Sequence, residues 1–197
     1  MQKKSLIDRL KLAVLLGSAI IINGQMIDTM TCKGVFTAEC VRDGKVIWTD
    51  TFNNLVVNVG KNHMLDTDLA GSSYTVVGPF MGLISSVGYS VISAADTMTS
   101  HAGWTEAGNA NAPTYTAPRK TAAWSAASAG AKALSAPASF AILTTGTIKG
   151  AFMVYGTGAL STIDNTAGTL FSAGLFTGGD RAVLGGDVVN VSYSVSL

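Results

Sequence analysis

The sequence predicts an all-β fold, a jelly-roll-like β-sandwich preceded by an apolar N-terminal arm that is either helical or extended. Residues 187–197 alternate between apolar and small polar side chains, which is the pattern of a strand with one buried face. Asp43-Gly44 separates two strand-like runs and favours a two-residue hairpin turn. About eight strand-like runs, separated by long connections and without a helical repeat, are typical of a sandwich or jelly roll.

The predicted arm covers residues 1–30, and the predicted sandwich domain covers residues 31–197. Residues 12–22 form an apolar run of 11 residues, about half the length that a membrane-spanning helix needs. A basic start before such a run is also typical of a secretory signal. We expect instead an arm that lies on a neighbouring subunit. A helix packed on its own domain is the main alternative, and membrane insertion is the least favoured. The arm residues expected at the interface are Leu12, Val14, Leu15, Leu16, Ile20, Ile21 and Ile22.

The next elements follow from local patterns. Residues 34–41 and 45–52 flank the Asp-Gly turn and predict the two strands of a hairpin. A short helix follows, with Met64, Leu65 and Leu69 on one side and Asn58 or Gly60 near its cap. Residues 76–86 predict a buried strand broken at Gly78-Pro79, because proline cannot donate a hydrogen bond to a sheet.

A long connection from residue 93 to 138 is dense in small residues and prolines and shows no sustained period. Connections of this length are uncommon in a compact domain and usually have a function. We expect extended segments that contact neighbouring subunits, including a strand near residues 119–125. Its candidate interface residues are Trp104, Tyr115, Arg119 and Trp124. Five further strands are predicted at residues 139–144, 147–155, 169–176, 182–184 and 187–197.

The composition indicates an assembly. Charged residues make up 13% of the 197-residue chain, against roughly 25% in an average soluble protein. Mean hydropathy is +0.37. A free monomer usually keeps a well-charged surface without large apolar patches, so much of this surface is expected to be covered by other subunits. The net charge is +1, with the basic excess in the first eleven residues. The folded domain therefore lacks the basic stripe that nucleic-acid binding needs.

Residues that could carry chemistry are few. Cys32 and Cys40 are too far apart along one predicted strand for a disulfide unless the chain turns, and they lack metal-ligand spacing. We expect both to be reduced. His63 lies near two aspartates and is expected to be a surface or cap group. His101 and Glu106 could act as an acid–base pair, but a loop anchored by the tryptophan between them is the simpler interpretation.

The glycine-rich turn that contains Asp180, Arg181 and Asp187 offers two interpretations. Two aspartates near glycine turns could hold calcium, although the spacing is not that of an EF-hand. A turn in which Arg181 pairs with its flanking acids is favoured. No nucleophile elbow or phosphate loop is found. We therefore predict no catalytic residue, no metal site and no cofactor.

Several motifs, in order over about residues 50–197, resemble a family of small virion proteins of tailed bacteriophages. The resemblance is specific as a set, although each motif is weak alone. It implies a jelly-roll-like cement protein seated on the lattice of the major capsid protein, as found in some short-tailed phages. The arm lies outside this pattern. The motifs are residues 54–60 (Asn-Leu-Val-Val-Asn-Val-Gly), 82–84, 95–106, 147–152, 170–176, 179–183 and 186–193.

The expected function is therefore that of a non-enzymatic capsid cement (decoration) protein. Its expected partners are the major capsid protein and other copies of itself, as a dimer or trimer. The expected location is the virion, and the host cytoplasm during assembly. The alternatives are a tail or head-fibre protein, a membrane-anchored envelope protein, and a glycoside-type enzyme that uses Glu106 and an aspartate.

Overall fold

The computed structural model describes residues 15–16, 19–22, 25–28, 32–68 and 77–196. The chain divides into two units, residues 1–32 with residue 197, and residues 33–196. In the first unit, β1 (Leu15–Leu16), β2 (Ala19–Ile22) and β3 (Gln25–Asp28) form an antiparallel sheet in the order β1-β2-β3. The described part of the arm is thus extended, one of the two forms expected for it. The predicted interface residues Leu12 and Val14 lie outside the described residues.

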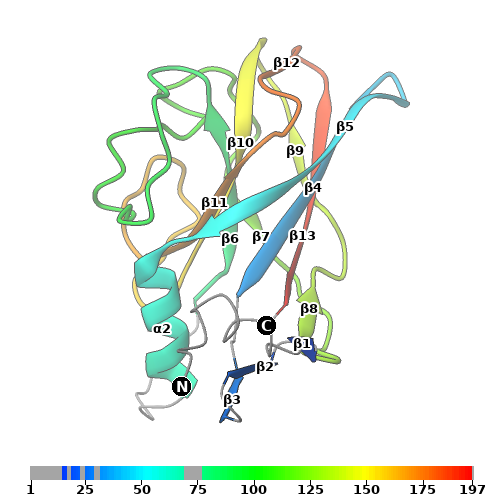
Figure 1. Ribbon diagram of the computed structural model, residues 1–197. Helices are drawn as coiled ribbons and strands as arrows, with labels where there is room; N and C mark the ends of the chain where they lie inside the picture. The colour runs from blue at the N-terminus through cyan, green and yellow to red at the C-terminus, as the bar shows by residue number, and fades with distance from the viewer. Residues whose placement is uncertain (1–14, 17–18, 23–24, 29–31, 69–76, 197) are drawn as a thin grey trace, which may run out of the picture. The chain divides into compact units, whose positions relative to one another are not determined.

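The second unit is a single antiparallel sheet of ten strands, which confirms the all-β prediction (Figure 1). Eight strands follow each other across it in the order β7-β6-β10-β11-β5-β4-β13-β8, while β12 pairs with β10 and β9 pairs with β13. The strands are β4 (Lys33–Arg42), β5 (Lys45–Val56), β6 (Phe80–Ser85), β7 (Lys120–Thr121), β8 (Ala131–Ala133), β9 (Ala138–Ala141), β10 (Gly146–Tyr155), β11 (Thr169–Leu175), β12 (Arg181–Val183) and β13 (Val188–Ser196).

The sheet curls into a sandwich-like form because β5 belongs to both of its halves. The first part of β5 pairs with β4, and its last residues pair with β11. Phe171 of β11 and Tyr193 of β13 have ring centroids only 6.4 Å apart. Two strands separate β11 from β13, so in a flat sheet the spacing would be about 14 Å. The contact between these rings therefore requires the two halves to face each other.

The hairpin and the C-terminal strand form as the sequence predicts. Asp43 and Gly44 have φ angles of 49° and 73°, the left-handed pair that a tight hairpin turn requires. Along β13, Val189, Val191 and Tyr193 are buried, whereas the residues between them are only half-buried. β13 pairs with β4 over its whole length, and both β4 and β13 contribute side chains to the interior.

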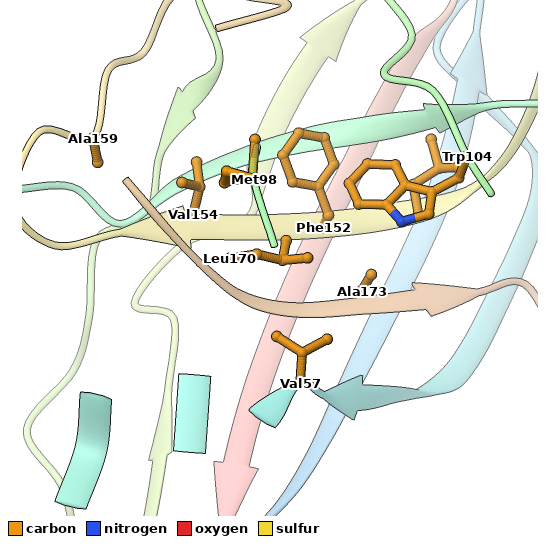
Figure 2. Packing of buried hydrophobic residues seen from close by; sticks show 9 residues of the cluster. Val57, Met98, Trp104, Phe152, Val154, Ala159, Leu170 and Ala173 are labelled. Carbon is orange, nitrogen blue, oxygen red and sulfur yellow. The ribbon is translucent and has the colours of Figure 1, made fainter. Parts of the chain in front are cut away.

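A separate apolar cluster lies on the face of β10 and β11 that points away from Phe171. Figure 2 shows side chains of the long connection, Met98 and Trp104, over Phe152 and Leu170 of these strands. Five of the six residues of β6 are buried, as expected for a strand covered on both faces. The rest of the cluster comprises Val57, Ile84, Val154, Ala159 and Ala173.

The single helix among the described residues, α2 (Asn58–Asp68), lies where a short helix was predicted, but it turns a different side inward. Leu65 is 47% exposed, whereas His63 is buried with its ring centroid 4.3 Å from that of Tyr155. The prediction that His63 is a surface or cap group is therefore wrong, and Leu65, which was predicted on the same side of the helix as Met64, is exposed. Gly60 explains the rotation, because a Cβ at this position would lie 2.5 Å from the Phe171 carbonyl oxygen. Leu69 lies outside the described residues.

Candidate contact surfaces

The first half of the long connection is anchored by Trp104, which is 1% exposed. Its indole Nε1 donates a hydrogen bond of 3.0 Å to Asp96 Oδ2, and its ring packs against Phe152 with centroids 5.1 Å apart. His101 stacks on the same indole at 4.1 Å, with Nδ1 3.0 Å from the Trp104 carbonyl oxygen. The loop anchored by a tryptophan, favoured from the sequence, is confirmed.

A buried ion pair between Glu106 and Arg119 holds three loops together. Arg119 Nε and Nη2 donate to the two Glu106 oxygens at 2.9 and 2.6 Å. The same carboxylate accepts the hydroxyl of Tyr115 and the backbone N–H of Asp164, at 3.3 and 2.8 Å. Burial and the neighbouring carboxylate raise the pKa of Tyr115, which keeps its hydroxyl a donor. Four donors therefore occupy the carboxylate that was the candidate acid–base group.

Three of the predicted interface side chains lie inside the domain. Trp104, Tyr115 and Arg119 are 1%, 2% and 1% exposed. The chain's own loops and strands bury them, so the expectation that these side chains touch a neighbouring subunit is corrected. Trp124 is half-buried and remains accessible.

The loops that this ion pair joins enclose an open groove of about 610 Å³. Arg119 Nη1 and Nη2 also donate to the carbonyl oxygens of Leu160 and Asn165, so the guanidinium fixes both walls. No charged residue lines the groove. The walls include Asn109, Thr114, Pro118, Leu143 and Ile163. This groove is a preformed, uncharged surface feature.

The glycine-rich turn does not pair its own charges as predicted. Arg181 Nη2 donates to Asp50 Oδ2 at 2.7 Å, Asp187 binds Arg42 through two hydrogen bonds of 2.6 and 2.8 Å, and Asp180 pairs with Lys149. The prediction that Arg181 bridges Asp180 and Asp187 is therefore wrong. Its three charges instead pin the turn to other strands, with partners 31 to 145 residues away in the chain.

Two of these carboxylates are strongly acidic. The hydrogen bond from Arg42 outweighs burial and lowers the pKa of Asp187 to about 2. Burial alone would raise the pKa of Asp50, but hydrogen bonds from Thr177, Arg181 and Gly178 lower it to about 2. Both residues therefore stay ionised and act as structural acceptors at neutral pH.

Cys32 and Cys40 form no disulfide, so both are reduced, as predicted. Cys40 is fully buried, and its Sγ lies 3.4 Å from Asp187 Oδ2. Burial and this carboxylate raise the pKa of the Cys40 thiol to about 12. The thiol is therefore protonated and unreactive at neutral pH, because the thiolate is the nucleophilic form.

One end of the domain exposes large apolar side chains that the sequence analysis did not single out. Val46, Ile47, Leu143 and Leu184 are 56%, 48%, 61% and 41% exposed. Hydrogen bonds at the Arg42–Asp187 pair and between the turns at 142 and 186 bring these residues to the same end. We call these four residues the apolar rim. A signal existed for Val46 and Ile47, because two consecutive apolar residues beside a hairpin turn cannot both face inward.

The opposite end carries a second apolar surface, a groove of about 170 Å³ that we call the apolar groove. It lies where β4 begins and β13 ends, near α2 and β8 (Figure 1). Lys132 is its one charged lining residue. The other lining residues are Met64, Pro79, Trp124, Met153, Tyr155, Phe171 and Val195. Of the interface residues predicted in the long connection, the structure thus places only Trp124 on an accessible apolar surface.

The described part of the chain contains neither a metal-binding cluster nor a membrane-spanning helix. Within it, no three His, Cys, Asp or Glu residues are grouped so that they could hold a metal ion. No helix there is long and apolar enough to cross a membrane.

Comparison with known proteins assigns no family. No protein-family model, no curated protein and no solved structure matches the chain. The likeness to tailed-phage virion proteins therefore rests on the sequence motifs alone.

Proposed function

We propose that the chain is a non-enzymatic virion structural protein that binds and stabilises the capsid lattice of a tailed bacteriophage. One observation carries the proposal: a single domain exposes two different apolar surfaces at opposite ends, the apolar rim and the apolar groove. Surfaces of this kind mark interaction sites. Two unlike surfaces suit a subunit that joins different neighbours, here the major capsid protein and other copies of the chain.

The residues with reactive side chains support a structural role. The Glu106 carboxylate is buried and occupied by four donors, and the Cys40 thiol is buried and protonated. A general acid or base needs a reachable proton position, and a thiol nucleophile needs the thiolate. These groups instead hold loops and strands in place, which gives the contact surfaces a rigid support.

The mechanism is stabilisation by binding. A protein that binds only the assembled, expanded lattice adds its interface free energy to that state by mass action. An apolar rim contributes through burial of about 25 cal/mol per Å² of apolar surface removed from water. Because many copies act on one shell, modest affinity per copy is enough to raise the temperature at which the shell opens.

The test is binding to expanded capsids that lack the protein, measured by co-sedimentation. Ile47→Asp places a charge in the rim and should reduce occupancy at least tenfold. Val91→Asp is the matched control, because Val91 is 56% exposed elsewhere and should leave occupancy unchanged. Equal occupancy of both variants would contradict the role of the rim.

Copy number per virion separates the structural alternatives. A number comparable to the major capsid protein supports a lattice cement protein, and quantitative mass spectrometry of purified particles measures it. A few copies to a few dozen would instead indicate a tail or head-fibre protein. Absence from particles would reject both the cement and the tail or head-fibre role. The membrane-anchored and enzymatic alternatives would then be favoured.

A further inference from the structure

We propose that the apolar groove binds the apolar N-terminal segment, residues 12–22, of a second copy of the chain. This contact between copies does not depend on whether a capsid is the other partner.

The groove is small, apolar and firmly walled. Its volume of about 170 Å³ is close to that of an apolar cavity of roughly 150 Å³ that accepts a benzene molecule. It therefore suits one large aliphatic side chain, with neighbouring residues lying across the rim of the groove. Phe171 is held between Tyr155 and Tyr193, with ring centroids 5.5 and 6.4 Å away, so this wall is preformed.

The N-terminal part of the chain joins the domain beside this groove. Val195, which lines the groove, is the register partner of Gly34, the second residue of β4. Lys33, the first residue of β4, therefore lies at the same end of the domain as the groove. In an assembly of identical copies, each copy supplies one groove and one apolar segment.

The segment matches the groove in chemistry. Residues 12–22 contain Leu12, three consecutive isoleucines at 20–22, and no charged side chain. The groove has one charged lining residue. An uncharged aliphatic segment can therefore enter without burying an unpaired charge.

The segment also requires a partner surface. Strands β1, β2 and β3 contain two, four and four residues. A sheet of this size cannot bury apolar side chains against itself, because a small sheet gains stability by packing a hydrophobic face on another element. With only 13% charged residues in the chain, a second copy is the occupant that also accounts for its weakly charged surface. Exchange of such segments between identical copies is a low-cost route to an oligomer.

The test is complementation between two variants of the full-length protein. Ile21→Asp alters the segment and leaves the groove intact, whereas Val195→Asp alters the groove and leaves the segment intact. Light scattering after size exclusion should give an oligomer for the unaltered chain and at least tenfold weaker self-association for each variant. An equimolar mixture should recover oligomers, because each variant supplies the part that the other lacks.

Several outcomes would overturn the proposal. They are a monomeric unaltered chain at tens of micromolar, variants that associate like the unaltered chain, or a mixture that behaves as two separate proteins. The last result would indicate a segment that binds within its own copy. Val91→Asp serves as the surface control, and far-ultraviolet circular dichroism checks folding. If Val195→Asp does not fold, Lys132→Glu with Trp124→Ala replaces it as the groove variant.

Discussion

The two halves of the long connection are both rich in alanine, but the first half is anchored in the interior and the second half is exposed. Residues 93–119 and 123–136 contain seven alanines each. The first half covers the sheet, with Trp104, Glu106 and Arg119 at 1%, 5% and 1% exposure. In the second half every residue from 125 to 133 is exposed, in a hairpin that turns at Ala129-Gly130. A few large side chains with suitable partners therefore decide whether a segment of small residues joins the interior.

The largest change in the free energy of unfolding is expected from Arg119→Ala, in the buried half. The substitution leaves Glu106 buried without its guanidinium partner, and loss of one member of a buried pair costs about 3–5 kcal/mol. The free energy of unfolding, from urea denaturation followed by fluorescence, should fall by that amount. Lys132→Ala in the exposed half is the control and should change it by less than about 0.5 kcal/mol. Similar values for the two variants would show that the buried half is not the anchored one.

Low pH should weaken two ion pairs that lie outside the long connection, Arg42–Asp187 and Asp50–Arg181. The pKa values of Asp50 and Asp187 fall from 3.8 to about 2 in the folded protein. Folding therefore favours their ionised forms, and this stabilisation is fully present above pH 4 and is lost as the pH falls through about 2. Because the Arg42 and Arg181 side chains are 33% and 25% exposed, screening reduces the contribution to about 1–2 kcal/mol for each carboxylate.

Urea denaturation at a series of pH values between 6 and 2 checks this dependence. In Asp187→Asn the free energy of unfolding should fall less between pH 4 and pH 2, because the amide cannot titrate and cannot form the charged pair with Arg42. Glu39→Gln is the control, because Glu39 is a half-buried carboxylate of β4 whose side-chain partner is the amide of Asn190 and not an arginine. If Asp187→Asn loses as much unfolding free energy below pH 4 as the unaltered chain, the role given to Asp187 is contradicted.

Local patterns explain which parts of the fold could be predicted from the sequence. The alternation of β13 and the Asp43-Gly44 turn depend on neighbours within a few residues, and both were predicted correctly. The inward side of α2 was not, because it depends on close approach of Gly60 to the Phe171 backbone, 111 residues away in sequence.

The contact surfaces were harder to predict for the same reason. Trp104, Tyr115 and Arg119 have the side chains typical of an interface, and their composition alone cannot distinguish an internal partner from an external one. Arg119 is buried because Glu106 and the carbonyl groups of two residues near 160–165 surround it. The pairs Arg42–Asp187 and Asp50–Arg181 join residues 145 and 131 positions apart. No spacing rule connects charges at such distances.

The smallest effect on stability is expected in the exposed hairpin. Insertion of two serines between Ala129 and Gly130 lengthens a solvent-exposed turn, and the added loop entropy costs well below 1 kcal/mol. The melting temperature should therefore stay within about 2 °C of the unaltered chain, as scanning calorimetry would show. The same insertion between Gly108 and Asn109 disturbs the loop joined to the Glu106–Arg119 pair and should lower it clearly, since a Cβ at Gly108 would already lie 2.7 Å from Ile163. If the hairpin insertion leaves stability intact but abolishes binding to capsids, the second half of the connection is a contact element in the sense first expected for the whole. If both stability and binding persist, the contacts belong to the apolar rim and the apolar groove, and the hairpin only closes the sheet edge at β8.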